Sequence, residues 1–165
     1  ELLARIGETA SAAVARLMDG ARVAHLACHG TFRADNPSFS SLELSDGPLT
    51  VLDLEAIERA PDLVVLASCD TGASEALPGE ELLGFLTSLL MLGTKAVIAS
   101  AVPVPDVDTA PMMVALHEQL SRGASVGTAL RVARAVPESA TIAGLVTSLA
   151  FGCFGDGDVT VGTPT

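Results

Sequence analysis

The chain has no tryptophan or tyrosine, and aromatic residues make up only 3% of its 165 residues. Its core must therefore be built from Ala, Val, Leu and Ile, a composition that suits helices packed closely on a parallel sheet. Hydrophobic residues reach 49%, so disorder is a poor description of the chain. Because the length suits one ordinary domain, we expect residues 1–165 to form a single domain.

Basic residues are also scarce, with 9 Lys and Arg against 20 Asp and Glu and a net charge of -11. Binding of nucleic acid or of an anionic membrane surface needs clustered basic side chains, so we expect neither contact. The same charge would steer a basic peptide towards the protein, although plain solubility is the simpler explanation.

Cysteine is limited to Cys28, Cys69 and Cys153, an odd number without the spacing of a disulfide framework. Reduced thiols inside a cell are the expected state, which predicts a cytoplasmic protein. The sequence begins at Glu1 rather than Met, and we interpret it as a fragment or the C-terminal part of a longer chain. Eight Arg against one Lys, with abundant Ala, indicate a GC-rich bacterial source.

Long uninterrupted hydrophobic runs are missing as well. Residues 82–104 are almost all apolar, but Gly93-Thr94-Lys95 interrupts them and Pro103 ends them. The two pieces have the lengths of a soluble helix and a strand, so we expect no membrane span.

Three apolar runs have the length of buried strands, and helical periodicity lies between and after them. This alternation predicts an α/β sheet with helices on both faces. A long loop or small hairpin around Leu42-Glu43-Leu44 is expected after the first strand. The predicted strands are 22–28, 62–68 and 95–100, with a final strand within 142–154; the predicted helices are 2–18, 50–59, 80–92, 108–120 with Pro111 in its first turn, and 125–136.

His29 and Cys69 each follow one of these strands, at the ends where α/β sheets bind ligands. If the two strands pair directly, their ends meet about 5 Å apart. An imidazole beside a thiol can take its proton and later give one to a leaving amine. Gly30 can present a backbone N–H to a developing oxyanion. From these residues alone, a structural His and a buried Cys remain an equal alternative.

Two local motifs favour the catalytic interpretation. The segment His25-Leu26-Ala27-Cys28-His29-Gly30 resembles the His-Gly motif of clan CD cysteine peptidases, such as caspases, metacaspases and separases. The segment 66–72, with Ser68-Cys69-Asp70-Thr71-Gly72, resembles their nucleophile motif. Together with Gly79-Glu80-Glu81-Leu82 and the run Gly93 to Ser100, their order is similar to that of the CHAT family, over roughly residues 23–136.

The resemblance implies a caspase-like three-layer α/β/α sandwich with a mainly parallel central sheet. It implies a cysteine endopeptidase that cleaves a protein or peptide substrate through an acyl-enzyme on Cys69, with His29 as general acid and base. The oxyanion donors would be the N–H groups of Gly30 and Cys69. No cofactor is implied, and the expected partner is an additional regulatory domain or subunit such as tetratricopeptide repeats. A non-catalytic interaction or regulatory module of the same fold is the alternative.

For the remaining acidic, histidine and cysteine residues we expect binding or structural roles. Asp70 and Glu80 are candidates for substrate binding, and Asp35 and Glu43 have similar standing. No metal is expected, because His25 and His29 would lie about 13 Å apart along a strand. We interpret His25 as a packed, hydrogen-bonded histidine; the other expectations are Cys28 and Cys153 in the core and His117 facing solvent.

Overall fold

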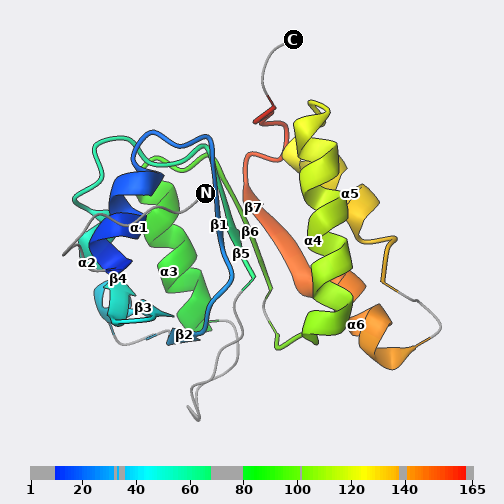
Figure 1. Ribbon diagram of the computed structural model, residues 1–165, viewed down its shortest axis with the longest axis horizontal. Coiled ribbons are helices and arrows are strands. Elements are labelled where there is room, and N and C mark those ends of the chain that lie inside the picture. Colours follow the sequence, from blue (N-terminus) through cyan, green and yellow to red (C-terminus); the bar gives the residue numbers. More distant parts are fainter. Residues whose placement is uncertain are drawn as a thin grey trace.

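A four-stranded sheet with the order β1-β5-β6-β7 forms the centre of the computed structural model, which describes residues 10–31, 33, 36–67, 80–100, 102–137 and 141–162. Three of the strands are parallel, and the last is antiparallel to its neighbour (Figure 1). The mainly parallel central sheet is therefore confirmed. The strands are β1 (Val23–Leu26), β5 (Leu63–Leu66), β6 (Ala96–Ser100) and β7 (Phe151–Gly155).

Helices cover both faces of this sheet, which confirms the three-layer α/β/α sandwich (Figure 1). On one face lie α1 (Ala10–Met18), α2 (Val51–Leu54) and α3 (Glu80–Met91). On the other face lie α4 (Asp106–Ser121) and α5 (Val126–Ala133), with α6 (Ile142–Ala150) beside α4. In the described part of the chain, no helix combines the length and apolar character needed to cross a bilayer.

The central strands supply side chains to two separate cores. Val64 and Leu66 of β5 point towards α1 and α3, whereas Leu63 and Val65 point towards α4 and α5. Successive side chains of a strand face opposite sides, so a strand covered on both faces is apolar at every position. This double burial explains why the sequence shows uninterrupted apolar runs rather than alternation.

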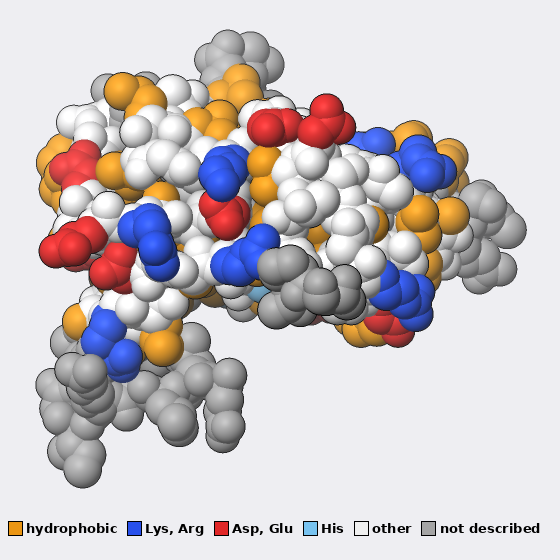
Figure 2. Space-filling model, turned by 90° about the horizontal axis from the view of Figure 1, so that it is seen from above, with side chains coloured by type: hydrophobic (Ala, Val, Ile, Leu, Met, Phe, Trp, Pro, Cys, Tyr) orange, Lys and Arg blue, Asp and Glu red, His pale blue; other side chains and the backbone are white. Residues whose placement is uncertain are grey.

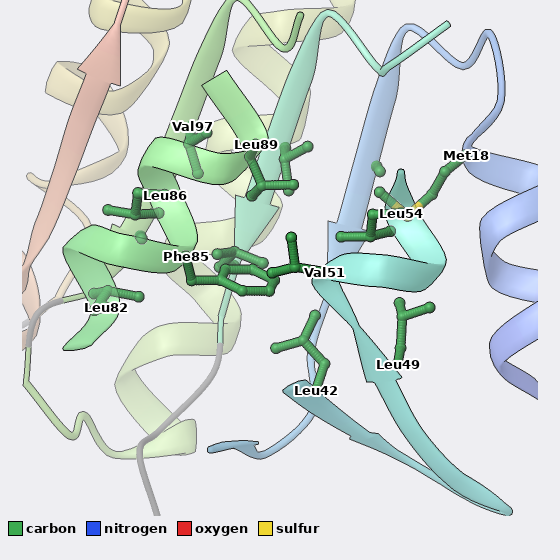
Figure 3. Close-up of a cluster of buried hydrophobic side chains, with 14 of the residues drawn as sticks. Met18, Leu42, Leu49, Val51, Leu54, Leu82, Phe85, Leu86, Leu89 and Val97 are labelled. Carbon is green, nitrogen blue, oxygen red and sulfur yellow. The ribbon is translucent and has the colours of Figure 1, made fainter. Parts of the chain in front are cut away.

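A small antiparallel sheet closes one end of the first core. It contains β2 (Gly30–Thr31), β3 (Ser41–Leu44) and β4 (Gly47–Thr50), and so confirms the hairpin expected around residues 42–44. Figure 3 shows Leu42 and Leu49 of this sheet on the same side as Phe85 of α3, whose ring extends towards Val51. All four side chains are essentially inaccessible to solvent.

The start of α2 follows the predicted cap. The side-chain oxygen of Thr50 accepts the N–H of Asp53 at 3.3 Å, and the carboxylate of Asp53 accepts the N–H of Thr50 at 2.8 Å. This reciprocal pair satisfies donors that the first helical turn would leave free. The helix ends at Leu54, which is earlier than expected.

One expectation from the sequence is wrong, and another is incomplete. Helix α4 begins at Asp106, so Pro111 is its sixth residue and removes an internal hydrogen bond to the carbonyl of Val107. The final strand expected within 142–154 is confirmed as β7, but helix α6 precedes it, because the side chain of Thr141 accepts the N–H of Gly144 at 3.0 Å and caps a helix there. Short apolar runs do not distinguish a buried helix from a strand.

Charged side chains are interspersed at the end of the sheet where the parallel strands begin. Asp62 contacts Lys95 at 2.7 Å and Arg22 at 3.9 Å. Figure 2, seen from this end, shows basic and acidic side chains lying next to each other rather than a basic patch. Acidic and basic side chains therefore offset one another's charge at this end of the sheet.

The contribution of α3 to the first core can be measured with a matched pair of substitutions. Leu89 is 2% exposed and Leu83 is 50% exposed on the same helix. We expect Leu89→Ala to lower the free energy of unfolding by about 2–5 kcal/mol, because it leaves a cavity. Leu83→Ala should change it by less than about 1 kcal/mol. Urea denaturation of both variants checks this difference, and equal losses would contradict the assigned face of α3.

Candidate active site

The first and second predicted strands pair directly, as expected. Strand β1 runs parallel to β5 with Leu26 opposite Leu66, and the N–H of Ala67 donates to the carbonyl of Leu26 at 3.0 Å. The two strands therefore end side by side at one edge of the sheet. His29 is the third residue after Leu26, and Cys69 is the third residue after Leu66.

The main chain around His29 is held by the neighbouring small sheet. The carbonyl of His29 accepts the N–H of Glu43 at 2.7 Å, and its side chain is exposed. The next residue, Gly30, is buried and lies opposite Leu42 in the antiparallel pairing of β2 with β3. Since hydrogen-bonded and non-bonded pairs alternate in such a ladder, the N–H of Gly30 points away from β3.

The structure describes only part of the predicted site. His29 and Gly30 are described, whereas Cys69 and Asp70 lie outside the described residues, as does Asp35. Glu80 is the first residue of α3. The predicted roles of these residues therefore remain predictions.

An open cleft of about 310 Å³ lies beside His29. Its lining residues come from the ends of β1 and β5 and from the start of α4, and we call it the His29 cleft. Asp106 contributes a carboxylate to it that the sequence interpretation missed. The sequence did contain a signal for Asp106, because this residue follows the third parallel strand, whose carboxyl end lies at the same edge of the sheet. The cleft is lined by Ala27, Cys28, His29, Ala67 and Asp106.

The two described cysteines are poor candidates for a nucleophile. Cys28 packs partly buried against the first core, and burial, followed by the nearby carboxylate of Glu43, raises the pKa of its thiol. Cys153 packs against the second core. Burial, and to a smaller extent the charge of Asp156, raises the pKa of its thiol, whereas the charge of Arg134 partly lowers it. A raised pKa reduces the thiolate population at neutral pH. The expectation that both are core residues is confirmed.

A contact between two histidines lies further back on β1. The Nδ1 of His25 is 2.8 Å from the Nε2 of His117 on α4, and the ring centroids lie 5.0 Å apart, so the two rings meet through their nitrogens. The hydrogen bond expected for His25 is confirmed, but its side chain is exposed rather than packed, and His117, expected to face solvent, is half-buried. One turn from the buried Met113, His117 lies at the margin of the packed face of α4.

The electrostatics of this pair follow from its position. Burial lowers the pKa of both imidazoles, and the second ring lowers that of His25 further. Glu118 and Ser121 line the same surface depression, and Glu118 also contacts Arg122 at 3.6 Å. Among the residues that the structure describes, no three His, Cys, Asp or Glu side chains come together as a metal-binding cluster.

Comparison with known proteins identifies one family. Residues 4–138 match the family model described as CHAT domain. No curated protein matches the chain. The matched range contains β1, β5 and β6 and both predicted motifs.

The histidine pair predicts a pH dependence of stability. The pKa values of His25 and His117 lie below 6.5 in the folded state, so the unfolded chain takes up protons that the folded imidazoles resist. The contribution of the neutral histidine pair to the free energy of unfolding is present above pH 6.5 and is lost as the pH falls below this value. His117→Gln removes one titrating group and its effect on the other.

We therefore expect the free energy of unfolding to fall more steeply in the wild type than in His117→Gln between about pH 7 and pH 5. Urea denaturation at several pH values measures both slopes. Carboxylates common to the two proteins cancel in the comparison. Parallel curves would show that the pair does not titrate with folding.

Proposed function

We propose that this chain, which belongs to the CHAT domain family of caspase-like clan CD proteins, is a cysteine endopeptidase with a His29–Cys69 dyad. The in-register pairing of β1 with β5 is the observation that carries the proposal. Leu26 and Leu66 are opposite each other, and the two functional residues follow them at the same interval. Parallel strands about 5 Å apart bring such residues within reach of one another.

In the proposed reaction, His29 removes the proton from the Cys69 thiol, and the thiolate attacks the carbonyl carbon of the scissile peptide bond. The tetrahedral oxyanion is stabilised by the N–H groups of Gly30 and Cys69. Its collapse breaks the C–N bond, and His29 gives its proton to the leaving amine. Water, activated by the same imidazole, then hydrolyses the thioester. The direction of the Gly30 N–H, away from β3, supports its part in this step.

The charge around the His29 cleft favours a basic substrate. Asp106 lines the cleft, and the carboxylate of Glu43 is close enough to the Cys28 thiol to influence its pKa. The chain as a whole carries a net charge of -11. We therefore propose a protein or peptide substrate with Lys or Arg next to the scissile bond, with Asp70 and Glu80 as further candidates for binding it.

The C-terminal segment supports one peptidase domain over residues 1–165. Strand β7, which lies beyond the family match, pairs along its whole length with β6 and completes the central sheet. We propose as its partner a separate regulatory domain or subunit, such as tetratricopeptide repeats. The free thiols of Cys28 and Cys153 support a reducing, cytoplasmic location.

Alkylation tests the dyad without a known substrate. We expect iodoacetamide to modify Cys69 rapidly at pH values well below the usual thiol pKa of about 8.5, and His29→Ala to slow this reaction. Cys28 and Cys153 are internal controls, because their raised pKa values keep them protonated. Mass spectrometry of the three cysteine peptides across about pH 5–9 measures each rate. An accessible Cys69 that reacts as an ordinary thiol, with or without His29, would favour the non-catalytic interaction module.

A peptide library tests the substrate. Cleavage should favour a basic residue before the scissile bond, and Asp106→Asn should lower kcat/KM for these peptides by about tenfold or more, since it removes a charge partner. The same substitution should leave the alkylation rate of Cys69 unchanged. Asp108→Asn, two residues further along α4, is the matched control. Equal effects of the two substitutions would contradict a role for Asp106 in recognition.

A further inference from the structure

The His25–His117 contact joins two elements that are far apart in the sequence. His25 lies on β1, and His117 lies about three turns into α4. Their facing nitrogens are 2.8 Å apart, and the ring planes are inclined by 24°. Each ring directs a nitrogen at the other, and a single proton between them satisfies the pair.

We propose that His25 Nδ1 and His117 Nε2 form a binding site for a divalent late transition-metal ion. Imidazole nitrogens are ligands that Ni²⁺, Cu²⁺ and Zn²⁺ favour, whereas Mg²⁺ and Ca²⁺ prefer oxygen. Metal–nitrogen bonds of about 2.0–2.1 Å at a right angle place two neighbouring donor atoms about 2.9 Å apart. The observed separation of 2.8 Å is close to this value. With the centroids 5.0 Å apart, the two nitrogens now face each other almost head-on, so each ring must turn to direct its lone pair at a common ion when the ion replaces the shared proton.

The surroundings leave room for the rest of the coordination shell. The pair opens into a surface depression of about 530 Å³, whose remaining lining residues are Met113, Val114, Glu118 and Ser121. Since no three-residue cluster of His, Cys, Asp and Glu is present among the described residues, two imidazoles supply the protein ligands. Water completes the shell, which suits the square-planar and octahedral geometries of Cu²⁺ and Ni²⁺.

The protonation state of the pair suits this exchange. Burial lowers the pKa of both rings, so both are neutral and able to donate a lone pair at neutral pH. The proton that now lies between the nitrogens moves to the other nitrogen of its own ring when the ion binds. No proton is released at neutral pH, whereas one or two are released when the rings start protonated, so binding should weaken in acid.

Such an ion would tie β1 to α4. His29 follows β1 by three residues and Asp106 begins α4, and both line the His29 cleft at the carboxyl edge of the sheet. Metal binding would therefore stabilise the scaffold on which the cleft is built. This inference does not require the proposed peptidase activity, because neither His25 nor His117 takes part in the proposed reaction.

Titration with Ni²⁺ tests the site. Isothermal titration calorimetry at about pH 7.5 should show one Ni²⁺ per wild-type chain. His25→Gln and His117→Gln should each weaken binding by about tenfold or more, because one of two ligands is lost. Thermal unfolding with Ni²⁺ should shift to higher temperature in the wild type, and the shift should disappear in both variants.

Two further variants separate this site from the proposed dyad. The chain has three histidines, so His29→Gln is the matched control and should retain Ni²⁺ binding, as should Cys69→Ser. Circular dichroism shows whether each variant is folded. Absence of Ni²⁺ binding to the wild type, or binding that persists in both His25→Gln and His117→Gln, would overturn the proposal.

Discussion

Burial of β5 on both faces is the constraint on which the rest of this structure depends. All four of its residues are at most 1% exposed, and their side chains divide between two cores. The peptide groups of a buried strand need hydrogen-bond partners, and β1 and β6 provide them on either side. Both neighbours run parallel to β5, so all three strands end at the same edge of the sheet. The candidate site is a consequence of that common direction.

The scaffold also gives neighbouring side chains different environments over very short stretches of chain. Cys28 and His29 are adjacent, yet the thiol packs against the first core while the imidazole is exposed. The chain has left β1 and bends at Cys28, so the two neighbouring side chains enter different surroundings. The hydrogen bond from Glu43 to the His29 carbonyl fixes the main chain at the transition from β1 to β2. The exposed side chain is therefore attached to a well-supported backbone.

Helix α4 links the two regions of chemical interest. Its first residue, Asp106, lines the His29 cleft, and His117, three turns later, contacts β1. The helix is anchored between these points by the buried Met112, Met113 and Leu116. Its packing on β1 and β5 thus decides both the charge of the cleft and the environment of His25. A shift of this helix would alter the two regions together.

The sequence by itself determined the fold class, the three parallel strands and the residues at their ends. Continuous apolar runs are the local mark of strands buried on both faces, and the Thr50–Asp53 pattern is a local cap. It also contains the two motifs, one around His29 and one around Cys69, that resemble those of one family. Only the tertiary structure decided that Asp106 enters the cleft, that His117 meets His25, and that a helix precedes β7. The first two depend on the approach of residues 77 and 92 positions apart, and the third on a short apolar run that suits a helix or a strand equally well. Local patterns encode which face of an element is buried, but they do not encode which distant element covers it.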